Sequence, residues 1–221
     1  MPKRPAHEGV FLLLMRHPER MAPAVRSIET FAVRSKEGGL ALTYRLRGEI
    51  SGLRVPPTAA TERVNGLWKH LCFEAFVTVP GEKSYLEFNF SPSGQWAAYA
   101  FSDYRQRAPM ADPFRTPKIT VRQCADELVL EALISGDDLP RSVGKYVEEN
   151  VVTDVQNDVE KTTGAALLCL GLSAVVETSK EECSYWALRH PRHPLGSPTP
   201  SPDFHHRDTF ILNLPAPKYS L

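Results

Sequence analysis

The chain has 221 residues and carries 26 basic and 26 acidic side chains, so its formal net charge is zero. This balance argues against a nucleic-acid partner and against an anionic membrane surface, because both favour a basic face. The hydrophobic content of 42% and the charged content of 24% are those of a folded globular protein, which excludes global disorder. No apolar stretch reaches transmembrane length. The apolar run at 9–15 is too short for a secretory signal, so we expect a cytoplasmic protein.

The first third of the sequence predicts three β-strands. Val10–Met15 is the first, and Ile28–Ser35 and Leu40–Leu46 follow as a pair joined by the hairpin connection Lys36–Gly39. Apolar and polar side chains alternate along the third segment, which is typical of a strand with one buried face. The proline-containing stretch from 51 to 65 is expected to form a loop.

The stretch Gly66–Phe101 predicts three further strands, joined by the tight loops Pro80–Lys83 and Ser91–Gly94. If the first loop has four residues, Val79 lies opposite Ser84, and the pleat of this strand pair follows. One face is then wholly apolar, with Phe73, Ala75, Val77, Val79, Leu86, Phe88 and Phe90. The other face carries Cys72, Glu74, Phe76, Thr78, Tyr85, Glu87 and Asn89. The first face is therefore core, and the second is a mixed surface that bears carboxylates.

The rest of the chain predicts more strands and one helix. The expected strands are Lys118–Val121, Leu128–Ile134, Ala166–Val176, Ser184–Leu188 and Thr209–Leu214. Between them, valines at every fourth position predict a short amphipathic helix within residues 144–164. Regularly spaced short strands with one helical interruption indicate an all-β fold, an antiparallel β-sandwich of jelly-roll-like kind. We expect one domain over residues 1–221, with 144–164 as an insertion.

Aromatic and acidic side chains provide one set of candidate ligand contacts. Trp68, Trp96 and Trp186 could stack on the C–H groups of a sugar ring, and acidic or amide groups could accept its hydroxyl protons. Tryptophans also serve as core or edge packing, and this alternative stays open for each of them. Glu74 and Glu87 fall on one face of neighbouring strands, as a glycosidase requires, although charged pairs are also common on solvated strand faces.

Histidines and aspartates provide a second candidate set in the C-terminal third. His190, Asp203, His205 and His206 have the side chains that suit zinc, nickel or iron. However, His205 and His206 are adjacent, so in a strand their rings would point to opposite faces. Asp203 could instead fix the orientation of an imidazole and order a loop. The prediction is accordingly that no metal ion and no cofactor is bound.

Five segments of the sequence resemble the bacterial DOMON-like proteins. They are Gly66–Phe76, Tyr85–Tyr99, Leu170–Glu177, Ser184–Pro191 and Pro202–Phe210. These proteins belong to a β-sandwich superfamily that includes the family-nine carbohydrate-binding modules and the haem- or sugar-binding DOMON domains. The resemblance implies a β-sandwich that binds a ligand. The segment 144–164 departs from the family pattern, and the four methionines lie in the N-terminal region or in a loop, which argues against haem.

The function predicted from the sequence is that of a non-enzymatic domain that binds a saccharide or a similar polyhydroxylated small molecule, with no catalytic residue. The residues expected to bind it are Trp68, His70, Glu74, Glu87, Asn89, Trp96, Tyr185, Trp186, His190, Asp203, His205 and His206. One alternative is a metal- or carboxylate-dependent hydrolase centred on the C-terminal His/Asp cluster. Another is an assembly module that forms a homo-oligomer through the 144–164 helix.

Overall fold

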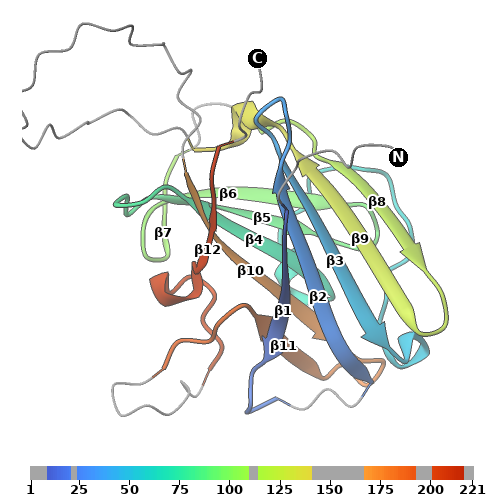
Figure 1. Ribbon diagram of the computed structural model, residues 1–221. Coiled ribbons are helices and arrows are strands. Elements are labelled where there is room, and N and C mark those ends of the chain that lie inside the picture. Colours follow the sequence, from blue (N-terminus) through green and yellow to red (C-terminus); the bar gives the residue numbers. More distant parts are fainter. Residues whose placement is uncertain (1–8, 21–23, 110–113, 141–166, 193–200, 217–221) are drawn as a thin grey trace, which may run out of the picture.

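The computed structural model of the protein describes residues 9–20, 24–109, 114–140, 167–192 and 201–216 (Figure 1). The helix predicted within 144–164 lies outside these residues. The described strands are β1 (Val10–Arg16), β2 (Val25–Arg34), β3 (Leu40–Gly48), β4 (Cys72–Thr78), β5 (Tyr85–Phe90), β6 (Trp96–Asp103), β7 (Gln106–Arg107), β8 (Lys118–Gln123), β9 (Glu127–Ile134), β10 (Leu168–Glu177), β11 (Cys183–Ala187) and β12 (Leu212–Leu214).

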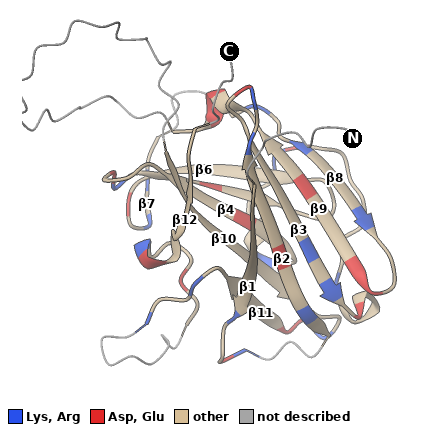
Figure 2. Cartoon of the chain, in the orientation of Figure 1, with Lys and Arg blue, Asp and Glu red and all other residues tan. Residues whose placement is uncertain are grey.

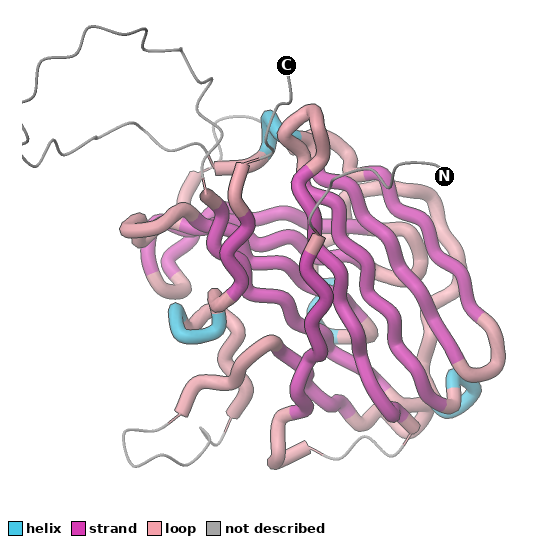
Figure 3. Tube along the Cα trace, viewed as in Figure 1, coloured by secondary structure: helices cyan, strands magenta, loops and turns pink. Residues whose placement is uncertain are grey.

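The helical elements of the described residues are short 3-10 turns (Figure 3). They are η1 (Ile50–Gly52), η2 (Leu67–Lys69), η3 (Gly136–Asp138) and η4 (Arg207–Thr209). None of these helices has the length and apolar character needed to cross a membrane. The strand predicted to begin at Thr209 is shorter than expected, because η4 occupies its first residue and β12 starts at Leu212.

The strands form an antiparallel β-sandwich, as predicted. Their hydrogen-bonded order is β7-β6-β5-β4-β10-β11-β1-β2-β3-β9-β8, and β12 pairs with β10. The two layers are joined at β1, whose residues Val10 to Leu14 pair with β2 while Met15 and Arg16 pair with β11. Figure 1 shows β2, β3, β9 and β8 as one layer in front of β4, β5, β6 and β10.

Apolar side chains from both layers fill the space between them. On β3, Leu40, Leu42, Tyr44 and Leu46 are fully or almost fully buried, which confirms the predicted alternation. The Tyr44 ring contacts Phe73 of β4 with a centroid distance of 5.0 Å, and its hydroxyl donates a hydrogen bond to the backbone oxygen of Glu74 at 2.7 Å. This bond satisfies a buried phenol and also fixes the distance between the two layers at the middle of β4.

The register of β4 and β5 is the predicted one. Phe73 lies opposite Phe90, and Val77 lies opposite Leu86, so the apolar face of this pair belongs to the core. The other face, with Glu74 and Glu87, is the outer face of the layer. The hydrophobic pattern fixes this register strongly, because a slip by one residue would turn every apolar side chain away from the core.

A third stratum covers part of this outer face. It consists of η2 and of residues 201–211, which we call the covering segment. The pairing of β12 with β10 brings the covering segment over the sheet, and Phe210 packs on β10 at Gly171. A Cβ atom at Gly171 would lie 2.7 Å from the Phe210 ring, so a glycine is needed for this close approach.

Candidate ligand pocket

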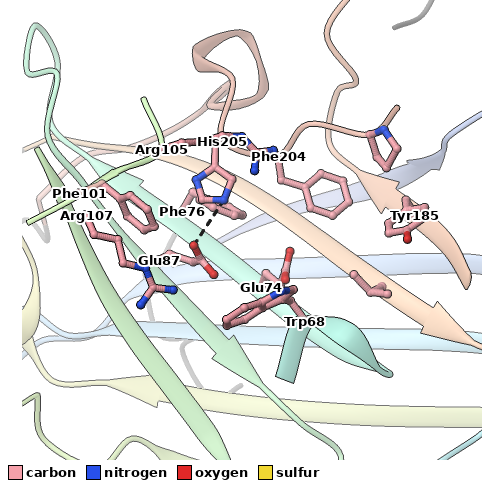
Figure 4. A pocket seen from close by; sticks show the side chains of 12 residues that line it. Trp68, Glu74, Phe76, Glu87, Phe101, Arg105, Arg107, Tyr185, Phe204 and His205 are labelled. Carbon is pink, nitrogen blue, oxygen red and sulfur yellow. Dashed lines mark ion pairs between the residues drawn. The ribbon is translucent and has the colours of Figure 1, made fainter. Parts of the chain in front are cut away.

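A cavity of about 330 Å³ lies between the outer face of the sheet and the covering segment (Figure 4). Strands β4, β5, β6, β10 and β11 form its floor, and the β6–β7 hairpin and η2 form its sides. The lining residues are Trp68, Glu74, Phe76, Glu87, Phe101, Arg105, Arg107, Val175, Tyr185, Pro202, Phe204 and His205. Residues far apart in the sequence therefore meet at one site.

Two glutamates rise from neighbouring strands into this cavity (Figure 4). Glu74 lies opposite Asn89 in the ladder, so Glu87 is its diagonal neighbour on the same face, at a distance of roughly 7–8 Å along the sheet. The exposed fraction is 2% for Glu74 and 5% for Glu87. The pair predicted on this face is therefore buried under the covering segment, whereas an ordinary strand face would leave it in water.

Each carboxyl group has its own hydrogen-bond partner. The Ser173 hydroxyl on β10 donates to Glu74 Oε2 at 2.9 Å, and the Asn89 amide donates to Glu87 Oε1 at 2.6 Å. Burial and, to a smaller extent, the nearby Glu87 charge raise the pKa of Glu74 to about 8, while the Ser173 hydrogen bond opposes the rise. Burial also raises the pKa of Glu87, against the effects of Asn89 and of Arg107. At neutral pH, Glu74 is thus a neutral carboxylic acid that can donate a hydrogen bond.

Aromatic rings form most of the apolar wall. Phe76 and Phe101 lie on the floor, Phe204 belongs to the covering segment, and Tyr185 lies on β11. Trp68 on η2 is 36% exposed and meets the ring of Tyr99 edge to face. Apolar rings beside a few polar groups are the usual lining of a small-molecule site.

His205 holds the covering segment to the floor. Its Nδ1 accepts a hydrogen bond from the Tyr85 hydroxyl at 2.7 Å, and that hydroxyl accepts one from the Arg105 backbone N–H at 3.1 Å. The Nε2 atom lies 3.6 Å from Glu87 Oε2 (Figure 4, dashed line). Burial and the Arg105 charge lower the pKa of His205 to about 4. The ring is therefore neutral at pH 7, and this network places its proton on Nε2.

Asp203 fixes the start of the covering segment to the β6–β7 turn. Its carboxylate pairs with the Arg105 guanidinium at 3.0 Å and accepts a hydrogen bond from the Tyr104 hydroxyl at 2.7 Å. Although burial opposes it, these hydrogen bonds lower the pKa of Asp203. Arg107, two residues after Arg105, also lines the cavity. Its guanidinium carbon lies 3.9 Å from the centroid of the Tyr99 ring.

Five of the residues predicted from the sequence line the cavity together: Trp68, Glu74, Glu87, Tyr185 and His205. Two more support them from outside. The Asn89 amide holds Glu87, and Asp203 both pairs with Arg105 and accepts a hydrogen bond from the His205 backbone N–H at 3.2 Å.

Two of the three tryptophans lie in the core. Trp96 and Trp186 are 3% and 5% exposed and pack in the sandwich interior. Trp186 follows Tyr185 on β11, so the pleat turns the two rings to opposite faces. Trp96 lies opposite Phe90 because the loop before it holds five residues, closed by a hydrogen bond from Ser91 N–H to the Gln95 backbone oxygen at 2.9 Å. The predicted four-residue loop would have placed Trp96 on the outer face.

Three of the predicted histidines lie away from the cavity. His70 Nδ1 lies 2.9 Å from Glu177, and His190 Nε2 lies 2.8 Å from the Met15 backbone oxygen. His206 caps η4, where its side chain accepts a hydrogen bond from the Asp208 N–H. Within the described part of the chain, no three His, Cys, Asp or Glu side chains are placed to hold a metal ion.

The sequence-based prediction missed the contribution of the β6–β7 hairpin and of the phenylalanines. Arg105 and Arg107 stand two residues apart, which puts them on one side of an extended segment, but this pattern is common on exposed hairpins. Phe101 and Phe204 carry no signal of their own in the sequence. Phe101 could have been found by continuing the outward face of β6 from Tyr99, at a spacing of two residues.

Comparisons with known proteins give one structural likeness. No protein-family model matches the chain, and no curated protein matches it. The fold is similar to a crystal structure from Bacteroides uniformis, described as a "putative carbohydrate-binding protein", with a TM-score of 0.55 and 14% identity over 93% of this chain and 85% of that one. At this identity the likeness concerns the fold. The relation to the DOMON-like proteins stays a prediction.

Proposed function

We propose that the protein binds a saccharide or a similar polyhydroxylated small molecule in this cavity. The observation that carries the proposal is the convergence of two buried carboxyl groups with aromatic rings under one covering segment. A sugar has the matching chemistry, because its hydroxyl groups both donate and accept hydrogen bonds while its C–H faces pack on aromatic rings. The proposal assigns the cavity to binding and gives no residue a catalytic role.

The size of the cavity favours a short saccharide. Its volume of about 330 Å³ lies at the lower end of the range of roughly 300–1,000 Å³ that is typical of small-molecule sites. The covering segment closes one side, so a long polysaccharide would meet Phe204 and His205. The carbohydrate-binding description of the Bacteroides protein supports the same class of ligand.

Trp68 offers a direct test by fluorescence, since it is the tryptophan that lines the cavity. We expect a saturable change in emission when the protein is titrated with glucose, galactose, mannose, N-acetylglucosamine, maltose and cellobiose, with at least one responding. The change should vanish in Trp68→Phe and persist in the matched control Trp186→Phe, whose ring lies in the core. Absence of any response, both by fluorescence and by calorimetry, at millimolar sugar would contradict the proposal.

The two alternatives gain less support. A hydrolase centred on the C-terminal His/Asp cluster requires its side chains to act together, but His190 and His206 are engaged elsewhere. An assembly role depends on residues 144–164, which lie outside the described part of the chain.

A further inference from the structure

Glu74 has one oxygen available to a bound molecule. The Ser173 hydroxyl provides the one hydrogen bond that its carboxyl group makes within the described residues, and it is made to Oε2. The side chain lines the cavity, where Figure 4 shows it beneath the covering segment. A ligand that offers a hydrogen-bond partner to the other oxygen therefore gains affinity from this position.

The charges around Glu74 decide which form of the carboxyl group is stable. Among the described residues that line the cavity, His205 is neutral and Arg105 is paired with Asp203, so that Arg107, with a smaller effect of Arg105, balances the charge of Glu87. Two neighbouring buried carboxyl groups beside one cation retain one proton between them. The groups that face Glu74 or share its cavity are Cys72 on β4, Glu87 on β5, Arg105 and Arg107 in the β6–β7 hairpin, Tyr185 on β11, His205 in the covering segment and Tyr44 on β3.

The proton resides on Glu74 because the partners of the two carboxyl groups differ. Glu87 accepts a hydrogen bond from the Asn89 amide, lies close to His205 Nε2, and is stabilised as an anion by Arg107. Among the described residues, the partner of the Glu74 carboxyl group is the Ser173 hydroxyl. The ionised form is therefore better stabilised at Glu87, which leaves Glu74 as the acid.

We propose that Glu74 donates a hydrogen bond to an acceptor oxygen of the bound sugar, so that the position beside Glu74 selects a neutral oxygen of the saccharide over an ammonium group. An ether or hydroxyl oxygen accepts this bond, while an ammonium group cannot accept one and requires an ionised carboxylate. This inference rests on the proposed binding function and specifies its ligand class. It also sets the direction of the pH dependence, because a neutral sugar loses its donor when Glu74 ionises.

The test uses the 221-residue protein and the tightest-binding neutral sugar of the panel named above, with glucosamine at pH 6 as the cationic counterpart. Between about pH 6 and pH 9 we expect the affinity for the neutral sugar to fall about tenfold, in proportion to the fraction of Glu74 that stays protonated. At pH 6, where its amine is protonated, glucosamine should bind more weakly than the neutral sugar. Burial raises the pKa of Tyr85, Tyr185 and Cys72, so these groups do not ionise over this range.

Substitutions isolate the role of the proton. Glu74→Gln keeps a neutral donor, so it should bind the neutral sugar at pH 6 within about threefold of the parent and show no fall at pH 9. Glu74→Ala should bind more weakly at both pH values. Glu29→Gln, on an exposed strand face, is the matched control and should behave like the parent.

A ligand-independent measurement separates this inference from the proposed function. Infrared difference spectra at neutral pH should show the C=O stretch of a protonated carboxyl group that is lost in Glu74→Gln. Absence of that band overturns the inference, regardless of which sugar the protein binds. A band together with a Glu74→Gln variant as pH-sensitive as the parent also overturns it and leaves the binding proposal standing. If the band is present but no sugar of the panel binds, both fail.

Discussion

Two faces of the sandwich carry glutamates at alternating strand positions, but these glutamates are partly exposed on one face and buried on the other. On the β2–β3–β9 face, Glu29 and Glu127 are partly exposed and form ion pairs with Arg45 and Arg47 at 3.3–3.7 Å (Figure 2). On the β4–β5 face, Glu74 and Glu87 are buried under the covering segment. The difference lies in what packs on the sheet and not in the strand pattern itself.

The two arrangements also differ in energy. Exposed ion pairs contribute about 0–1 kcal/mol each, so the charges on the β2–β3–β9 face have little effect on folding. A buried carboxyl group without a cation at ion-pair distance costs stability, and such strained groups concentrate at functional sites. The contrast therefore supports the proposal that the β4–β5 face binds a ligand.

The largest effect is expected from Phe210→Ala, which removes the ring that packs on Gly171 and Phe76. Loss of a buried aromatic side chain typically costs about 3–5 kcal/mol, measurable by urea unfolding. Because the covering segment loses its anchor, water should reach Glu74 and the pKa of that carboxyl should fall. Ile211→Ala, at a more exposed neighbouring position, is the control and should cost about 1 kcal/mol or less. Equal losses in the two variants would contradict this role of Phe210.

Glu74→Gln should stabilise the fold at high pH. The pKa of Glu74 is raised from 4.5 to about 8, so between these values the unfolded chain is ionised while the native state keeps its proton. Stability from this group is thus full below about pH 4.5 and is lost as the pH rises to about 8. We expect the variant to exceed the parent by roughly 2–4 kcal/mol at pH 8 and to match it near pH 4.5. A difference independent of pH would show that ionisation is not its cause.

His205→Gln tests a pH dependence of stability that is opposite in sign to that of Glu74. The pKa of His205 is lowered from 6.5 to about 4, so between these values the unfolded chain binds the extra proton. Its stability contribution is present above about pH 6.5 and is lost as the pH falls through about 4. Thermal unfolding should show the parent losing roughly 2 kcal/mol over this window, and the variant losing less. The adjacent His206→Gln, which changes a half-exposed ring, should retain the parent's slope.

The smallest effect is expected on the β2–β3–β9 face. Glu29→Gln removes one partner from the exposed pairs with Arg45 and Arg47 and should change the free energy of unfolding by at most about 0.5 kcal/mol. The residual change should shrink further in high salt, because solvent screens these charges. A cost of several kcal/mol, measured by the same urea unfolding, would mean that the two faces do not differ as described.

Local patterns predicted the strands and the pleat well, because each rests on residues close in sequence. A four-residue turn was enough to fix Val79 opposite Ser84, and hence which face of β4 and β5 is core. The loop predicted at Ser91–Gly94 is one residue longer in the structure, and this additional residue turns Trp96 toward the core. The cavity itself could not be predicted. The hydrogen bond between Tyr85 and His205 spans 120 residues, and only tertiary packing brings the two together.

The position of the covering segment has a consequence for synthesis of the protein. Residues 201–211 and β12 are made after the strands that they cover, and β10 pairs with both β4 and β12. A growing chain can complete the β4–β10 ladder while Phe76, Tyr85 and Phe101 still face solvent, and the cavity is complete only when β12 has docked. A ribosome that stalls near residue 200 would thus leave an exposed aromatic surface, which is the kind of surface that chaperones and proteases recognise.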